Sequence, residues 1–576
     1  MQVEASFPAE AAVKIKSESA RSTARARWLA VGVLCFLVGF SFFWRHVAGF
    51  LLLGSNYNPL VYNAQALRNS DPEAYFVKPD ALLWDETYAY ARYTQQVLQG
   101  DYWGSTFLVY CPYLRGANCP SRFPFYFDRL GPLVLGLGTQ ITGDVRGTFM
   151  LADFIFPALL TCVLVAFVYT LTRRLDVAVL GALLFIWFNW SDVVNLVVML
   201  LGGRVTGEVL LLRTPYPQLA LILFTLFLIG LVQTEQAPNW MWIIIGGLAL
   251  ALNFYAYVYA WTMAVVLLGI LIAVEVVEHF WRGNDAQRRI VALVGIFGLG
   301  LVLAFPVWGG YLFAADVARD LAARTGEGIS HSPDLRWTVI LIVILLPLLF
   351  LTRKNGPFEN FKSRKLWMAF WLTGIVVVNI QVLTGRSVQS GHWIQYFLEP
   401  FFGIYLVDMG LCVWQQWRRG AMLGIPQAYV TLAISLLFLL GMGQNILRLT
   451  WAAEDQKDYT RRDANFEQLI QTLDTLDPNT IIITQDAYLN RVLRGYVARR
   501  FLPPTWLDPL SQADVQRLTV AATLNPANAA TNNGTLSLDT DHVVVVINRH
   551  QPADSEFSGT KRIILNDDFE LGYFRE

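Results

Sequence analysis

The chain has 576 residues, with 44 acidic and 44 basic side chains, and its mean hydropathy is +0.42. Hydrophobic residues make up 55% of it and charged residues only 15%, whereas soluble proteins carry about 25% charged residues. This composition indicates a membrane protein rather than a soluble one. With a net charge of zero, nothing in the composition points to nucleic acid, and we expect no such partner.

Apolar stretches of the length that crosses a bilayer, roughly 17 to 25 residues, recur from residue 28 onward. They lie near 28–52, 150–172, 177–199, 218–234, 241–258, 259–280, 290–311, 336–352, 367–384, 396–414 and 425–448. The aromatic stretch FYAYVYAW is interpreted as a tight turn inside one long apolar run. The sequence therefore predicts a polytopic α-helical membrane protein with about eleven transmembrane helices.

Basic residues orient this bundle. The N-terminal tail carries several of them in a long polar segment that lacks the layout of a cleavable signal, so we expect the tail to stay in the cytoplasm. Counting alternate loops from there places the basic groups at 173–174, 282–289, 353–365 and 418–419 on the same side. The positive-inside rule supports this map, and an odd number of helices leaves the C-terminus outside.

Three parts of the chain follow from this topology. Residues 1–27 are predicted to form a cytoplasmic tail, 28–448 a transmembrane module with its first extracytoplasmic loop at 53–149, and 449–576 an extracytoplasmic domain. In that domain ANFEQLIQTLDTL has helical spacing, and NTIIIT and HVVVVIN are typical of short buried strands. We therefore expect a small α/β domain, with TLNPANAATNNGTLSLDTD as a polar loop.

Cysteine usage agrees with this arrangement. Cys35, Cys162 and Cys412 lie in apolar stretches, whereas Cys111 and Cys119 bracket CPYLRGANC in the first outer loop. On an oxidising side of the membrane, that second pair is expected either to close a short disulfide or to stay as two thiols. Its spacing and the lack of nearby ligands argue against zinc.

An acidic pair, Asp85 and Glu86, stands in the loop stretch LLWDETYAYARYTQQVLQGDYWG. One interpretation is purely structural: Asp85 caps the helix that follows, Glu86 favours its first turn, and Gly100 ends it. In the other, this helix lies along the membrane surface with its tyrosines, Tyr88 among them, in the interface. An acid held there meets both a lipid-borne and a water-borne molecule.

Such a carboxylate suits general-base catalysis. It would take the proton of an acceptor hydroxyl as that hydroxyl attacks a sugar carbon bearing a phosphate leaving group. The chemistry is like inverting glycoside cleavage, with the acceptor in place of water. No separate acid is needed for a phosphate leaving group, but positive charge from Arg, Lys or His is.

With its cytoplasmic N-terminus, about eleven helices, long first outer loop and outer C-terminal domain, the chain resembles the integral-membrane glycosyltransferases of the C superfamily (GT-C). WDETYAYARYTQQVLQGDYWG is similar to the acidic motif of that family's first loop. The resemblance implies a polyprenyl-phosphate-linked sugar as donor and no cofactor. It also implies Asp85 as the base and Glu86 as a second acid that places the acceptor or the base.

Other segments look like those of bacterial GT-C members such as protein O-mannosyltransferases and aminoarabinose transferases. The residues implied to bind the donor phosphate are Arg204, Arg213, Arg386 and His392, and those implied to contact substrate are Tyr88, Asp128, Gln389 and Tyr396. LTGRSVQSGHWIQYFLEP is expected to be an outer loop that carries four of these. The alternatives are interfacial snorkelling for the arginines and a local ion pair of Asp128 with Arg129.

Two acids, Asp153 and Asp192, lie inside or beside apolar stretches, where an ionisable group is by default a functional hypothesis. We expect both at the membrane rim. A metal held by Asp85, Glu86 and a third carboxylate is a further alternative, but GT-C enzymes that use lipid-phosphate sugars generally need none, so no metal is expected.

The function expected from the sequence is therefore inverting sugar transfer to a glycan, lipid or protein acceptor at the outer face of a cell membrane, in bacteria the inner membrane. Membrane lipids are the other expected partners. Two rival classes stay open: a multi-pass transporter or flippase, which tends to show paired halves and charges buried near mid-membrane, and a non-catalytic scaffold. Neither requires an acid pair at the start of an interfacial helix.

Overall fold

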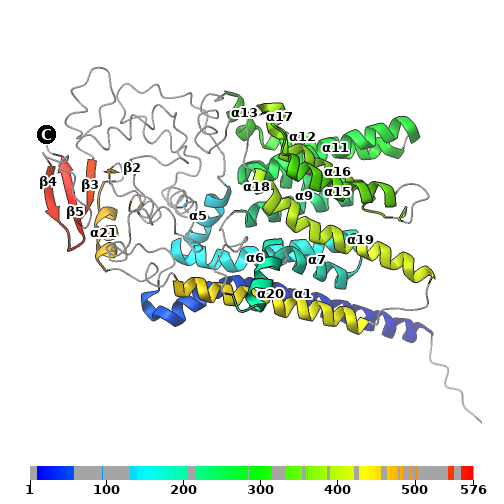
Figure 1. The fold of residues 1–576 in the computed structure, drawn as a ribbon, viewed down its shortest axis with the longest axis horizontal. Helices are drawn as coiled ribbons and strands as arrows, with labels where there is room; N and C mark the ends of the chain where they lie inside the picture. The colour runs from blue at the N-terminus through cyan, green and yellow to red at the C-terminus, as the bar shows by residue number, and fades with distance from the viewer. Residues whose placement is uncertain are drawn as a thin grey trace, which may run out of the picture.

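The computed structural model is a bundle of long helices with a small β-sheet beyond one end (Figure 1). The residues that it describes are 9–57, 94, 130–143, 145–187, 190–203, 216–282, 285–313, 331–352, 358–359, 361–385, 390–420, 427–455, 464–477, 480–483, 489, 493, 497, 500–502, 543–549 and 560–574.

Seven helical stretches among the described residues are long and apolar enough to cross a membrane. They lie in α1 (Ala9–Leu53), α6 (Val145–Thr172), α9 (Gln218–Gln236), α11 (Val258–Arg282), α12 (Asp285–Leu303), the continuous run of α18 (Ser390–Trp393), η4 (Ile394–Leu398) and α19 (Glu399–Gly420), and α20 (Gln427–Asp455). Shorter apolar helices are α5 (Leu130–Thr142), α7 (Leu175–Trp187), α10 (Trp240–Ala256) and α15 (Leu335–Leu351).

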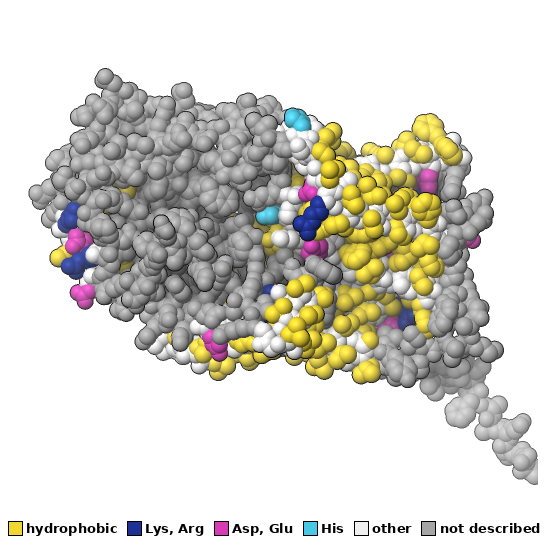
Figure 2. Space-filling view, in the orientation of Figure 1, with side chains coloured by type: hydrophobic (Ala, Val, Ile, Leu, Met, Phe, Trp, Pro, Cys, Tyr) yellow, Lys and Arg dark blue, Asp and Glu magenta, His cyan; other side chains and the backbone are white. Residues whose placement is uncertain are grey.

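The bundle is apolar outside as well as inside. Hydrophobic side chains cover the face of the helices seen in Figure 2, and many large ones are exposed, among them Phe36, Val291 and Val343. A soluble bundle would place polar side chains there, because only a bilayer removes such a surface from water. The chain therefore has the architecture of a polytopic α-helical membrane protein.

Several helices differ from the predicted stretches at their ends. Helix α1 begins at Ala9, well inside the predicted tail, because AEAAVKIKSESARSTARAR is rich in strong helix formers. The third predicted stretch is divided into α7 and α8 (Trp190–Leu200). The seventh breaks between α12 and α13 (Phe305–Phe313), where Pro306 lacks the N–H that would continue α12.

The ninth predicted stretch is also divided, into α16 (Arg364–Val378) and α17 (Ile380–Thr384). The break is at Asn379, whose side chain donates to the Ile375 carbonyl at 2.8 Å and to the Thr338 hydroxyl at 2.7 Å. Gly385, with a φ of 72°, then ends α17 in the left-handed region that favours glycine. The predicted turn in FYAYVYAW is confirmed, since α10 ends at Ala256 and α11 begins at Val258.

The C-terminal sheet is mixed. Its strands are β1 (Ile481–Ile483), β2 (Arg500–Leu502), β3 (Val543–Asn548), β4 (Thr560–Ile564) and β5 (Phe569–Phe574), in the order β2-β1-β3-β5-β4. β1 pairs in parallel with β2 and β3, whereas β5 pairs antiparallel with β3 and β4. Helix α21 (Ala464–Asp474) buries Phe466, Leu469 and Leu473 in a core shared with this sheet.

The bundle has two ends, which we name from this sheet. The domain end, toward α21 and the sheet, holds the C-termini of α1 and α20 and the N-terminus of α6 (Figure 1). There Arg146 of α6 forms an ion pair with Glu467 of α21 at 3.8 Å. The far end is the opposite one, where α6 meets α7 and α11 meets α12.

Candidate functional site

An aromatic cluster lies at the domain end of the bundle, built by the α10–α11 turn and the α18–η4 segment. We define it as Tyr216, Tyr257, Tyr259, His392 and Tyr396. Tyr257 is the single extended residue between α10 and α11, with φ −157° and ψ 127°. This break turns the chain and places the rings of Tyr257 and Tyr259 beside that of His392, at centroid distances of 6.2 and 4.5 Å.

His392 is the polar centre of the aromatic cluster. Its Nδ1 lies 2.5 Å from the Tyr257 hydroxyl, and its ring meets the ring of Tyr396 edge-on at 5.4 Å. When the phenol donates to Nδ1, the ring proton is on Nε2, which is then a hydrogen-bond donor. The cluster therefore combines one imidazole donor, several hydroxyls and aromatic faces.

Neighbouring contacts hold the aromatic cluster in place. The Trp393 indole donates to the Tyr259 carbonyl and to the Thr262 hydroxyl, each at 3.1 Å, which ties α18 to α11. Tyr216 stacks on Tyr257 at 5.8 Å, and its hydroxyl accepts from the Gly131 N–H at 2.7 Å. Segments distant in the sequence thus fix the orientation of the rings around His392.

A second group of polar residues lies deeper at the same end, and we call it the clasp: Arg45 and His46 of α1, Tyr57 just after α1, and Asp153 of α6. Asp153 is fully buried and pairs with the Arg45 guanidinium and with His46 Nε2, the latter at 2.7 Å. His46 Nδ1 lies 2.9 Å from the Tyr57 hydroxyl. Burial raises the pKa of the Tyr57 phenol, so it stays protonated and keeps a hydrogen to donate.

The clasp joins the end of α1 to α6. The chain turns at Gly54, with a φ of 57°, and folds Tyr57 back on α1, where a Cβ on Gly49 would lie 2.2 Å from the Tyr57 ring. Asp153 belongs to α6, which follows α5 (Leu130–Thr142) in the chain. One hydrogen-bonded chain, from Tyr57 through His46 to Asp153, therefore ties the start of the first loop to α6.

Sequence reasoning missed the clasp, although its signal was present. Arg45 and His46 interrupt an apolar stretch, FFWRHVAGF, which is by itself a reason to look for a partner. Asp153 was predicted to lie at the membrane rim; the structure adds that it is buried between α1 and α6 and paired with Arg45. Asp153 can be buried because Arg45, on a helix remote in the sequence, compensates the charge of its carboxylate.

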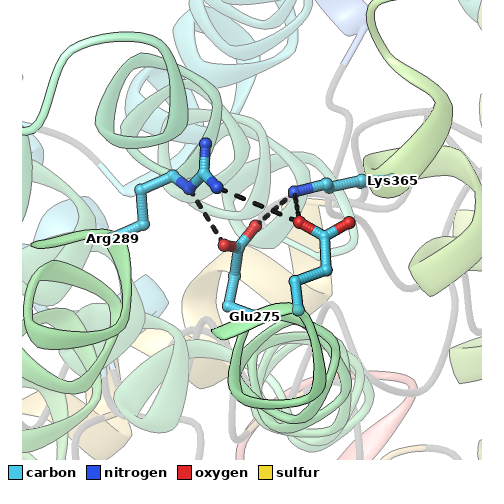
Figure 3. Close-up of polar contacts among 4 residues, drawn as sticks. Glu275, Arg289 and Lys365 are labelled. Carbon is cyan, nitrogen blue, oxygen red and sulfur yellow. Dashed lines mark hydrogen bonds and ion pairs between the residues drawn. The ribbon is translucent and has the colours of Figure 1, made fainter. Parts of the chain in front are cut away.

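A third polar group, the far-end network, joins α11, α12 and α16. Glu275 accepts from Arg289 Nε at 2.9 Å and from Lys365 Nζ at 2.7 Å, as Figure 3 shows. Lys365 also donates to Glu278 at 2.6 Å. The Glu275 side chain is only 4% exposed, while those of Lys365 and Arg289 are 24% and 29% exposed.

Replacing Glu275 by glutamine should reduce the free energy of unfolding by about 1.5 to 3 kcal/mol, the range for hydrogen bonds to charged groups. The reason is that the buried acceptor of two cations loses its charge. Glu278→Gln is the matched control, since that side chain is 23% exposed, and it should cost no more than about 1 kcal/mol. Unfolding by SDS in mixed micelles measures both, and equal losses would contradict the network's dependence on Glu275.

The structure describes only two of the residues that the sequence implicates in binding or catalysis, His392 and Tyr396. Both belong to the aromatic cluster, and Tyr396 is 2% exposed. The remaining ones fall outside the described residues: Asp85, Glu86, Tyr88, Asp128, Arg204, Arg213, Arg386 and Gln389, together with Cys111 and Cys119. Of Asp192 only the backbone is described, in α8.

The predicted outer loop around His392 is wrong in part. Residues 390–398 are helical, as α18 and η4, and lead directly into α19. The reason is the spacing of Trp393, Ile394 and Phe397, which places apolar side chains on one buried face. His392 is therefore held by a helix start rather than by a free loop.

The sequence was compared with protein-family models and with curated proteins, and neither comparison found a match.

Proposed function

We propose that the protein is a GT-C-like glycosyltransferase that moves a sugar from a polyprenyl-phosphate donor to an acceptor, with inversion. The observation that carries the proposal is the position of the aromatic cluster. It lies at the domain end of the bundle, the end toward α21 and the C-terminal sheet. A donor with a lipid tail and a sugar-phosphate head needs a site at one end of the bundle, with its tail among the helices and its head in water.

The proposed topology has eleven crossings: the seven long stretches, together with α10, α15, the α7–α8 pair and the α16–α17 pair. Basic residues gather at the far end, at Arg173, Arg174, Arg288 and Arg289 and at the start of α16. By the positive-inside rule the far end then faces the cytoplasm. The aromatic cluster and the C-terminal sheet face the exterior of a cell membrane, in bacteria the inner membrane, so that the reaction serves the cell envelope.

In the proposed reaction Asp85 takes the proton of the acceptor hydroxyl, with Glu86 as a second acid beside it. The hydroxyl attacks the sugar carbon, and the bond to the phosphate oxygen breaks. His392, whose Nε2 donates while Nδ1 engages Tyr257, stabilises the charge that develops on the phosphate, together with Arg204, Arg213 and Arg386. Tyr88, Asp128, Gln389 and Tyr396 shape the sugar and acceptor sites.

A second candidate, a transporter, is favoured by one observation. Ionisable groups are buried inside membrane helices: Asp153 with Arg45, and Asp408, which is 5% exposed and accepts from the Trp367 indole at 2.8 Å. Such groups mark ion or substrate pathways in transporters. The clasp, however, is internally compensated, and the Asp408 carboxylate lies against the N-terminal turn of α16, where the helix dipole favours a negative charge.

His392→Phe should reduce kcat/KM for the lipid-phosphate donor by about 10²- to 10³-fold, the cost of removing one donor to a developing oxyanion. Phenylalanine keeps a ring between Tyr259 and Tyr396 but has no N–H. The measurement is the initial rate of transfer against donor concentration in lipid vesicles. His331→Phe is the matched control, because that exposed histidine lies outside the aromatic cluster; unchanged donor kinetics in His392→Phe would reject the role given to His392.

A further inference from the structure

Helices α1 and α6 pack antiparallel in a constant register. Trp28 meets Tyr169 at 5.8 Å, and further along Phe43 meets Phe154 at 6.4 Å. The advance from 28 to 43 along α1 equals the retreat from 169 to 154 along α6. This register places Cys35 opposite Cys162, since the two are equally far in sequence from Trp28 and Tyr169.

The two helices also approach closely beside these cysteines. A Cβ on Gly39, one turn beyond Cys35, would lie 2.5 Å from the Phe154 carbonyl oxygen and 3.0 Å from the Ala158 Cβ. Together with the register, this close approach sets Cys35 and Cys162 at the same level of the α1–α6 contact. A disulfide needs Cα atoms about 4.4 to 6.8 Å apart, a separation that only a close helix pair provides.

The two thiols differ in access. Cys162 is exposed, whereas Cys35 is buried. Leu159 and Ile155, which precede Cys162 by one and two turns of α6, are 44% and 42% exposed and form an apolar outer face. A reagent that reaches Cys162 there must itself be apolar, and it reaches Cys35 only through Cys162.

We propose that Cys162 and Cys35 form a redox-active pair that reacts with lipid hydroperoxides. The Cys162 sulfur attacks the terminal peroxide oxygen, the O–O bond breaks, and the lipid leaves as an alcohol with the thiol proton. Cys162 is then a sulfenic acid, and the Cys35 sulfur displaces its hydroxyl as water. Two thiols and one hydroperoxide thus yield a disulfide, one lipid alcohol and one water.

Cys162 is assigned the reaction with peroxide because it is exposed, and Cys35 the formation of the disulfide because it lies opposite Cys162. Susceptibility of a cysteine to peroxide follows its thiolate character and its exposure, and a nearby second thiol converts the sulfenic acid to a disulfide before further oxidation. The product joins α1 to α6 covalently, on the far-end side of the clasp. It forms independently of sugar transfer, so the pair is testable whether or not the proposed reaction exists.

The experiment treats the full-length protein in lipid vesicles with cumene hydroperoxide, then alkylates free thiols and digests with trypsin. Cleavage after arginine yields peptides 28–45 and 147–173, each with one of the two cysteines. The expected result is loss of both alkylated peptides and the appearance of one linked species, two hydrogens lighter than their sum, which dithiothreitol reverses. Two separate peptides after treatment, still alkylated or irreversibly oxidised, would overturn the proposal.

A pair of variants tests the order of the steps. In Cys35→Ala the sulfenic acid on Cys162 has no partner thiol, so dimedone should label peptide 147–173. In Cys162→Ala peptide 28–45 should stay unlabelled, because Cys35 is shielded from the apolar face. Labelling of peptide 28–45 instead would overturn the assignment of Cys162 as the residue that meets the peroxide.

Discussion

Asp153→Asn is expected to reduce the free energy of unfolding by about 3 to 5 kcal/mol, the cost of breaking a buried ion pair by removing one partner. The variant leaves the Arg45 guanidinium, which is only 7% exposed, beside a neutral amide in the interior of the bundle. His46 also loses the carboxylate that lies 2.7 Å from its Nε2. The measurement is SDS-driven unfolding of the purified protein in mixed micelles.

Asp176→Asn is the matched control for this experiment. Asp176 also pairs with an arginine, Arg174, but their side chains are 28% and 38% exposed, so the change should cost no more than about 1 kcal/mol. The double variant Arg45→Met/Asp153→Leu should recover most of the loss, since it removes both charges from the interior. Equal losses for Asp153→Asn and Asp176→Asn would show that the clasp is not a buried, compensated unit.

Asp85→Asn is expected to reduce sugar transfer by about 10²- to 10⁴-fold, the usual contribution of a general base. An asparagine caps a helix as well as an aspartate does but takes no proton, so folding and thermal stability should be nearly unchanged. Asp85→Ala is the less informative variant, because it also removes the helix cap predicted from the sequence, at about 1 kcal/mol. The measurement is transfer from a polyprenyl-phosphate sugar in vesicles, with unfolding followed in parallel.

A result of equal transfer by wild type and Asp85→Asn would leave Asp85 as a helix cap only. Loss of wild-type activity on adding a chelator would instead favour a metal at the pair of Asp85 and Glu86, the alternative that two adjacent carboxylates leave open. The two outcomes are distinguishable because the first is measured on the Asp85→Asn variant and the second on the wild-type protein with a chelator.

Features that depend on local sequence were predictable. The long apolar stretches, the turn at Tyr257, helix α21 and strands β1 and β3 all follow from hydrophobic periodicity and from turn residues. The extension of α1 to Ala9 was missed, although its composition is helical, because the polar tail was considered only for its charge. The helix breaks at Ala304 and Asn379 each depend on a single residue. Pro306 ends α12, and the Asn379 side chain forms a hydrogen bond with the Ile375 carbonyl where α16 ends.

The polar groups were harder to predict, because each is completed by residues remote in the sequence. Nothing in FFWRHVAGF says that the partner of Arg45 is Asp153, since that depends on the α1–α6 register. The link between His392 and Tyr257 likewise depends on how α18 meets the α10–α11 turn. What the sequence did indicate was the residue type: ionisable groups among apolar ones, and histidine among tyrosines.

The measurement that tests the central proposal most directly is sugar transfer by the purified wild-type protein in lipid vesicles, supplied with a panel of polyprenyl-phosphate sugars and crude acceptor extract. We expect one donor to be consumed, polyprenyl phosphate to be released, and the product to carry the opposite anomeric configuration. If folded protein consumes no donor of the panel while it moves a solute across the vesicle membrane, the proposal is wrong and the protein is a transporter.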